Sequence, residues 1–179
     1  MEKNIIALAG PPCSGKTSAG RLLSVLLRAD FIDTDRLIQT KHGHTVEYIF
    51  RIEGEAAFRA MERECISRVV SSVSRNTILS LGGGSLLDHS SMDLLQANAI
   101  LFTLRASPET LIKRNRGKRP LAADPEQMIS LMNEREAHYS SLGRIISTEA
   151  LTPSEVAAAI AAVLKEEGHP LWFPEDLPC

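Results

Sequence analysis

The sequence predicts an α/β fold with a parallel sheet, and two features of the chain predict it. Short apolar segments alternate with segments whose apolar residues recur at helical spacing, which is the pattern of βαβ units. A glycine-rich loop also joins the first apolar segment to the first helical one. With 179 residues, the chain is long enough to bury the core of one such domain.

Five short apolar segments are strand candidates. The first is almost wholly apolar, as expected for a strand that is covered on both faces of a parallel sheet. The candidates are residues 4–9, 31–32, 77–81, 99–104 and 145–146.

Two longer segments show helical periodicity. Residues 16–28 place apolar side chains at Ala19, Leu22, Leu23, Leu26 and Leu27. Residues 55–74 place them at Phe58, Met61, Cys65, Val69 and Val73. Further helices are expected after the start signals at 107–109, 124–127 and 152–155, the last of which contains a complete capping box.

Composition and charge narrow the class of protein. Hydrophobic residues make up 44% and charged residues 23%, as in soluble globular domains. The formal charge of −2 does not favour nucleic acid as a partner, and no apolar run is long enough to span a membrane. Three widely spaced cysteines and the lack of a signal peptide at the start indicate a cytoplasmic protein. We expect one domain over residues 1–168, with a core of about 4–165, and an extension at 169–179.

The loop at residues 10–17 matches the pattern G-x-x-x-x-G-K-[ST]. The backbone N–H groups of such a loop and the N-terminus of the next helix bind negatively charged phosphate groups. The loop therefore predicts binding of ATP or GTP. Lys16 reaches the β- and γ-phosphates, and the Thr17 hydroxyl is a ligand for Mg²⁺. The nucleotide-binding residues that we expect in this loop are Cys13, Ser14, Gly15, Lys16, Thr17 and Ser18.

The carboxylate for the metal is expected from Asp33 or Asp35. Many proteins with this loop use an aspartate at the end of another strand, but here residues 77–81 lead into three glycines. Asp33 and Asp35 follow the second strand, near the sheet edge where α/β proteins bind ligands. The alternative is that one of them only caps the helix that starts near Arg36.

Gly82, Gly83 and Gly84 leave a stretch of backbone without side chains after a buried strand. This arrangement favours close approach of a ligand, although a tight turn without a ligand has the same sequence.

Three arginine-containing segments are further candidates. Arg135 shares a helical stripe with Met132 and Tyr139, where a guanidinium needs an anion, either a ligand or an internal salt bridge. Arg59 by itself looks like a solvated residue of its helix. Residues 113–120 carry five cations, which form either a solvated surface or a lid over the phosphates.

Taken in order, these motifs resemble those of shikimate kinases over about residues 4–165. After the phosphate loop come Phe31-Ile32-Asp33-Thr34-Asp35, Gly54-Glu55 with Phe58-Arg59-x-x-Glu62, Leu81-Gly82-Gly83-Gly84, Arg119-Pro120-Leu121 and Asn133-Glu134-Arg135-x-x-x-Tyr139. The resemblance implies a three-layer αβα fold of the P-loop kinase type, with a five-stranded parallel sheet, a helical substrate-binding region and a lid. It also implies transfer of the γ-phosphate of ATP to shikimate with Mg²⁺.

The resemblance implies a role for each matching residue. Asp35 binds the acceptor hydroxyls and acts as base or orienter, while Asp33 and Thr17 belong to the Mg²⁺ site. Arg59 and Arg135 hold the shikimate carboxylate, and the backbone of Gly82, Gly83 and Gly84 completes that pocket. Arg119 is the lid arginine that reaches ATP, so Asp35, Lys16 and Arg119 form the expected catalytic set.

One position departs from the family's pattern. Cys13 stands where these proteins usually have a further loop glycine, so we expect a backbone there that avoids positive φ.

Two other functions stay open. A gluconate kinase has a similar loop and acidic pair, but its acidic motif would read D-G-D where this chain has Asp33-Thr34-Asp35. A non-catalytic nucleotide-binding homologue would not need Lys16 and Asp35 together. We expect a monomer whose partners are ATP and shikimate, without nucleic acid or membrane.

Overall fold

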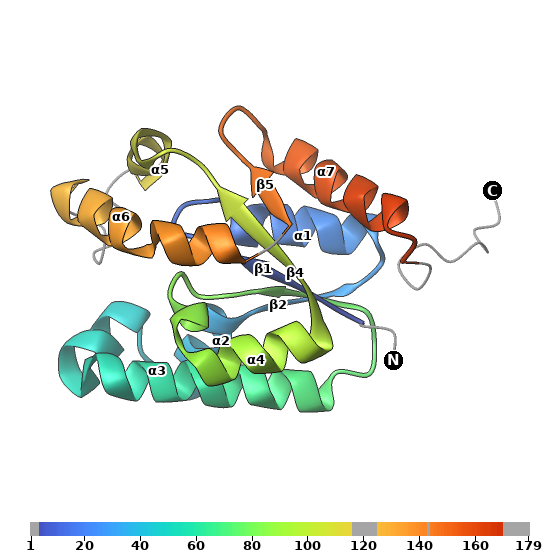
Figure 1. Ribbon diagram of the computed structural model, residues 1–179. Helices are drawn as coiled ribbons and strands as arrows, with labels where there is room; N and C mark the ends of the chain where they lie inside the picture. Colours follow the sequence, from blue (N-terminus) through green and yellow to red (C-terminus); the bar gives the residue numbers. More distant parts are fainter. Residues whose placement is uncertain (1–3, 116–124, 143, 170–179) are drawn as a thin grey trace.

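The computed structural model describes residues 4–115, 125–142 and 144–169. Its centre is a sheet of five parallel strands with helices on both faces (Figure 1), which confirms the predicted three-layer α/β fold. The strands are β1 (Ile5–Ala9), β2 (Asp30–Asp33), β3 (Thr77–Ser80), β4 (Ala99–Arg105) and β5 (Ile145–Ser147). All five fall on the segments that the sequence predicts.

The strand order is β2-β3-β1-β4-β5, so β1 lies in the middle with β3 on one side and β4 on the other. Ile6 of β1 is in register with Ile78 of β3 and with Ile100 of β4. The chain leaves β1 toward β2 and later returns to the opposite side of β1, which opens a crevice at the carboxyl end of β1. The phosphate loop follows β1 and therefore lies at this crevice.

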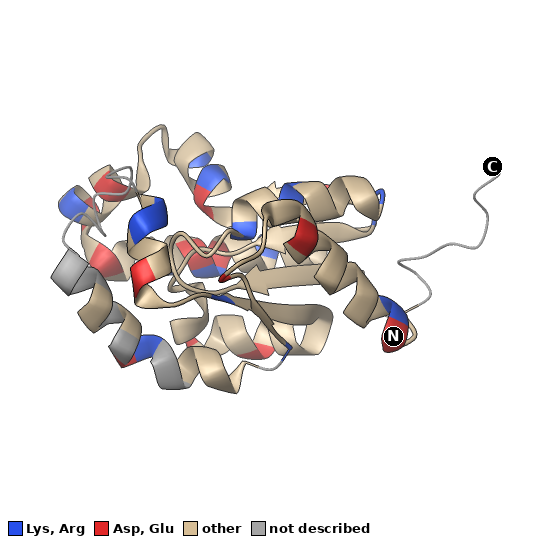
Figure 2. Cartoon of the chain, turned by 90° about the horizontal axis from the view of Figure 1, so that it is seen from above, with Lys and Arg blue, Asp and Glu red and all other residues tan. Residues whose placement is uncertain are grey.

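The helices are α1 (Lys16–Leu26), α2 (Thr34–His42), α3 (Val46–Ser72), α4 (His89–Asn98), α5 (Pro108–Asn115), α6 (Pro125–Ser141) and α7 (Pro153–Glu166), with a short 3₁₀ turn η1 (Ser85–Leu87). Acidic and basic positions are interspersed along the described chain (Figure 2). None of the helices in the described ranges combines the length and the apolarity needed to cross a membrane.

Alternation along the strands divides the core into two halves. Ile6 and Leu8 of β1 pack with α1 and α7, while Ile5, Ala7 and Ala9 point to the other face, where α3 and α4 cover them (Figure 1). Both faces of β1 are therefore buried, which explains why its sequence is a continuous apolar run.

Helix boundaries follow local signals where these exist. Thr152 and Glu155 form the predicted capping box at the start of α7. The Ser107 hydroxyl accepts the backbone N–H of Thr110 at the start of α5, and α6 begins at Pro125, as the start signals predict.

Three helical features differ from the sequence-based expectation. Gly54, with φ 86°, breaks α3 into two parts; the part after it corresponds to the helix expected at 55–74, and the part from Val46 was not predicted. The helix α4 has no clear periodic pattern, and we did not predict it. In α1, Ala19, Leu23 and Leu27 are buried as expected, but Leu22 and Leu26 are exposed.

Candidate active site

The phosphate loop leaves the N-terminal end of α1 accessible on the concave side of the loop. Gly15 caps α1 with φ 97° and makes no side-chain capping bond, so the first N–H groups of the helix are available to an anion. Lys16 is buried, and its ammonium donates to the carbonyls of Gly10 at 2.7 Å and Pro11 at 2.8 Å. The loop thus holds its lysine at the place where a phosphate would bind.

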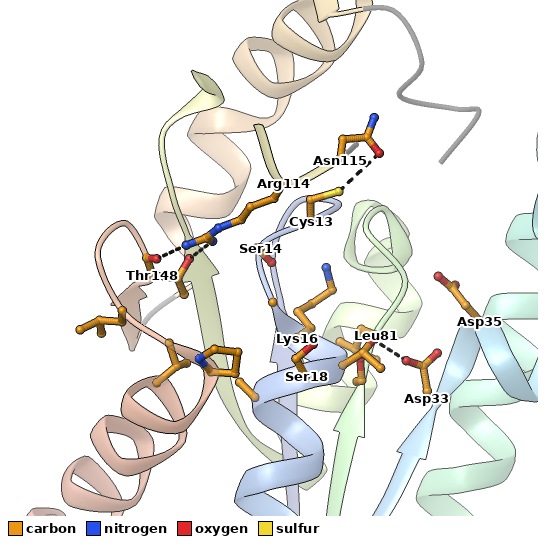
Figure 3. Close-up of a pocket in the computed structure, with 17 residues that line it drawn as sticks. Cys13, Ser14, Lys16, Ser18, Asp33, Asp35, Leu81, Arg114, Asn115 and Thr148 are labelled. Carbon is orange, nitrogen blue, oxygen red and sulfur yellow. Dashed lines mark hydrogen bonds between the residues drawn. The ribbon is translucent and has the colours of Figure 1, made fainter. Parts of the chain in front are cut away.

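Cys13 adopts φ 64°, so the expectation that its backbone would avoid positive φ is wrong. A non-glycine residue in this region costs about 1–2 kcal/mol, which the surrounding loop has to offset. The thiol lies 3.7 Å from Oδ1 of Asn115, and Cys13 packs against the small cluster of Leu111 and Met132. These contacts hold the side chain at the wall of the cavity that contains Lys16 (Figure 3).

We expect thiol alkylation to inactivate the protein through Cys13, and ATP to slow the inactivation. Cys13 lines the cavity, whereas burial raises the pKa of the Cys65 thiol to about 11, which keeps Cys65 unreactive near neutral pH. The measurement is the rate of inactivation by N-ethylmaleimide with and without ATP. Inactivation of Cys13→Ser at the wild-type rate would place the reactive thiol elsewhere.

Asp33 connects the phosphate loop to the second strand. Its Oδ2 accepts the Thr17 hydroxyl at 2.7 Å, and its Oδ1 accepts the backbone N–H of Arg36 at 3.1 Å. It therefore caps α2 and also touches the loop, so capping is not its sole role. Within the described ranges no cluster of three or more His, Cys, Asp or Glu side chains lies together. The hydroxyl–carboxylate pair suits Mg²⁺, which usually takes one or two protein oxygens and completes its shell with phosphates and waters.

Asp35 lies in the first turn of α2, and a hydrogen-bonded neighbour fixes that turn. The Thr34 hydroxyl accepts the N–H of Gly82 at 3.0 Å, which brings α2 against the glycine segment. Asp33 is the last residue of β2, whereas Asp35 belongs to α2, so the two carboxylates are held by different elements.

Two cavities meet at these aspartates. The nucleotide cavity, of about 480 Å³, contains the phosphate loop (Figure 3), and the acceptor cavity, of about 600 Å³, contains Arg59 and Arg135. Thr17, Asp33 and Asp35 line both cavities. A group transferred between a ligand in one cavity and a ligand in the other would pass these three side chains.

Arg59 is not a solvated surface residue. Its side chain is 20% exposed, and its guanidinium binds Glu55 at 2.8 Å and the buried Glu62 at 2.5 Å. Burial alone would lower the pKa of Arg59, but Glu62 and then Glu55 raise it above its usual value. Glu62 also accepts the Ser85 hydroxyl at 2.5 Å, so one buried carboxylate connects Arg59 to the turn after the glycines.

The three glycines give space to side chains of the protein itself. A methyl group on Gly82 would collide with Oε1 of Glu62 and with Oδ1 of Asp35 at 2.7 Å, and one on Gly84 would meet the Arg59 guanidinium at 2.6–2.9 Å. Gly83 lies against the ring of Pro12 in the phosphate loop. Close approach is therefore required, and side chains of the protein make it. Of the three glycines, Gly83 and Gly84 line the acceptor cavity.

The stripe of α6 faces inward as predicted. Met132 and Tyr139 are buried, and Arg135 lines the acceptor cavity between them. The Tyr139 hydroxyl donates to the carbonyl of Gly83, and burial raises the pKa of this phenol although Arg135 lowers it. The hydrogen bond attaches α6 to the glycine segment.

The far wall of the nucleotide cavity contains Arg114, from the cationic segment 113–120, and residues after β5 that the sequence did not single out individually. The Arg114 guanidinium donates to the hydroxyl of Thr148 at 3.0 Å and to its carbonyl at 2.5 Å (Figure 3), which fixes its plane beside Pro153 and Leu151. A guanidinium held in one plane, in a cavity that Leu151 and Pro153 also line, suits a flat base. The expected lid arginine, Arg119, lies outside the described residues, as does most of the segment 113–120.

Comparison with known proteins identifies the family. A family model described as shikimate kinase matches residues 12–165. The shikimate kinase of Caldicellulosiruptor saccharolyticus is 38% identical over 90% of this chain and 95% of its own length, and that of Symbiobacterium thermophilum is 36% identical over 92% and 98%.

Solved structures agree with the sequence comparison. The shikimate kinase of Acinetobacter baumannii in complex with shikimate superposes with a TM-score of 0.86 at 30% identity, over 94% of this chain and 96% of that one. A gluconokinase from Sinorhizobium meliloti has a TM-score of 0.58 at 18% identity, over 98% of this chain and 100% of that one, and shares the fold alone. With the match across residues 12–165 and relatives aligned over nearly their whole length, the chain belongs to the shikimate kinase family.

Proposed function

We propose that this chain transfers the γ-phosphate of ATP to a hydroxyl of shikimate at the junction lined by Thr17, Asp33 and Asp35. The observation that supports this function most strongly is that these three side chains belong to both cavities. A donor phosphate in the loop and an acceptor hydroxyl in the second cavity would then meet beside Asp35.

The acceptor cavity has the chemistry of a hydroxylated carboxylic acid. Arg59 and Arg135 offer planar, charged donors for a carboxylate. Asp35 offers an acceptor for hydroxyl groups at the other side, next to the phosphate loop. Shikimate carries one carboxylate and three hydroxyls, so it fits this division of charges.

Phosphoryl transfer in this site depends on positioning and charge balance. Lys16 leaves the carbonyls of Gly10 and Pro11 to bind phosphate oxygens. Thr17 and Asp33 would hold Mg²⁺, which would supply positive charge to balance that of the phosphates. Asp35 orients the acceptor hydroxyl and takes its proton. Arg119 is the residue that we assign to closing on ATP from the lid.

We also propose that the active unit is a monomer. We also assign the protein to the cytoplasm, where ATP and Mg²⁺ are available.

The function is tested by measuring ADP release in a coupled assay with shikimate, quinate, gluconate or no acceptor. We expect turnover with shikimate to be far higher than turnover with quinate, gluconate or no acceptor. Equal ADP release with and without shikimate would contradict the proposal, and a preference for gluconate would support the related sugar-acid kinase instead.

Replacing Arg135 with alanine tests the carboxylate site. One charge-assisted hydrogen-bond partner is lost, worth about 1.5–3 kcal/mol, so the KM for shikimate should rise roughly 10- to 100-fold. The KM for ATP should change little, because Arg135 does not line the nucleotide cavity.

Arg63→Ala is the matched control, since Arg63 pairs with Asp88 on the surface and lines neither cavity. It should leave both constants near their wild-type values. If Arg135→Ala raised both KM values equally, Arg135 would serve the fold and not the carboxylate.

A further inference from the structure

Three large apolar side chains on α1 face solvent. Leu22, Val25 and Leu26 are 44%, 77% and 56% exposed. Their spacing of three and four residues places them side by side on the helix surface, and we call them the α1 stripe. The opposite side of α1 is buried against the sheet and α7. An apolar strip at this spacing is typical of a helix face that packs against another segment, here the face of α1 that is turned away from the sheet.

The described chain ends close to the α1 stripe. Near their starts, Ser18 of α1 and Pro153 of α7 line the same cavity, and near their ends Leu27 and Leu164 share one core. The two helices therefore run side by side in the same direction (Figure 1), and α7 ends beside the end of α1. The N–H of His169 donates to the carbonyl of Leu164 at 3.1 Å, so the chain is held there until its last described residue.

The sequence after His169 has the composition of a docking segment. Leu171, Trp172 and Phe173 are consecutive, and Glu175 and Asp176 come after the intervening Pro174. The family match stops at residue 165, before this segment. At about 3.3–3.6 Å per residue, residues 171–173 reach roughly 7–14 Å from His169, which spans the 8–10 Å between packed helices.

Charge also matches across the two surfaces. Arg21 on α1 and Arg28 just after it are exposed, and neither has a carboxylate partner among the described residues. Arg21 directly precedes Leu22 of the stripe, and Arg28 lies two residues after Leu26, beyond the end of the helix. Glu175 and Asp176, one proline after the apolar triplet, would lie near these two cations.

We propose that residues 171–176 dock on the α1 stripe of the same chain, with Trp172 and Phe173 covering Leu22, Val25 and Leu26 and with the acidic pair beside Arg21 and Arg28. The short connection favours the segment of the same molecule over a second copy, because it keeps the segment at high effective concentration. Docking buries the aromatic side chains of the segment against the exposed aliphatic side chains of the stripe.

The single tryptophan makes the proposal directly measurable. Trp172 is the only tryptophan of the chain, so its fluorescence reports on this segment alone. In the full-length protein we expect emission at shorter wavelength than in the guanidinium-denatured chain, and several-fold weaker quenching by acrylamide. Val25→Glu and Leu26→Glu should each move the emission toward that of the denatured chain while the far-UV circular dichroism stays native.

Ile52→Glu is the matched control, because Ile52 is also an exposed apolar residue, 59% exposed, on another helix. It should leave the fluorescence of Trp172 unchanged. Three results would overturn the proposal. The first is that acrylamide quenches Trp172 equally in the native and the denatured protein, and the second is that Trp172 stays protected from acrylamide in both α1 variants. The third is that this protection disappears on dilution and that light scattering shows a dimer. The last result would assign the stripe to a second copy of the chain.

Discussion

Asp35→Asn is expected to reduce kcat by about 10²–10⁴-fold, the usual contribution of a positioned general base. Asparagine has nearly the same shape, so it keeps the packing against Gly82, but it has neither the charge nor the basicity of the carboxylate. The affinity for ATP should change little, because the loop groups around Lys16 and Thr17 are retained. Steady-state turnover and equilibrium binding of ATP measure the two effects separately.

The same substitution at Asp30 is the control. Asp30 is an exposed aspartate at the other end of β2, 3.9 Å from Arg75, and it lines neither cavity. Asp30→Asn should keep wild-type turnover. If Asp35→Asn kept kcat within tenfold of the wild type, Asp35 would only bind the acceptor, and the loose transition state would need no base.

The sheet and the phosphate loop could be predicted because local sequence determines them. A continuous apolar run is a strand covered on both faces, as at Ile5–Ala9, and the loop pattern fixes its own position between strand and helix. The contacts of Asp33 were also predictable in part, since a residue at the end of a strand can both cap the next helix and reach the loop.

The remaining features depend on tertiary contacts that no local pattern contains. Periodicity alone could not show that Leu22 and Leu26 would face solvent, because the position of α7 decides which side of α1 is covered. The glycine pattern at 82–84 predicted a close approach but could not name Glu62, Pro12 and Arg59 as the groups that approach. Cys13 adopts positive φ because the loop geometry overrides the preference of the residue.

Glu62 is the other residue where a large effect is expected, in this case on stability. It is 2% exposed and holds two donors, the guanidinium of Arg59 and the hydroxyl of Ser85. Removing one partner of a buried ion pair costs about 3–5 kcal/mol, because the other charge stays without compensation. Arg59 keeps Glu55, so we expect the low end for Glu62→Ala, about 3 kcal/mol or roughly 6–12 °C in Tm.

Glu55→Ala is the control within the same network, since Glu55 binds the same guanidinium but its side chain is 61% exposed. A pair with such an exposed partner contributes about 0–1 kcal/mol, so guanidinium denaturation should separate the two variants clearly. Glu62→Gln keeps the shape and one acceptor oxygen and should lie between them. Equal destabilisation by Glu55→Ala and Glu62→Ala would mean that burial of the carboxylate is not what holds Arg59. The ordering Glu62→Ala, then Glu62→Gln, then Glu55→Ala would instead show that one buried carboxylate fixes the arginine beside the glycine segment before any acceptor binds.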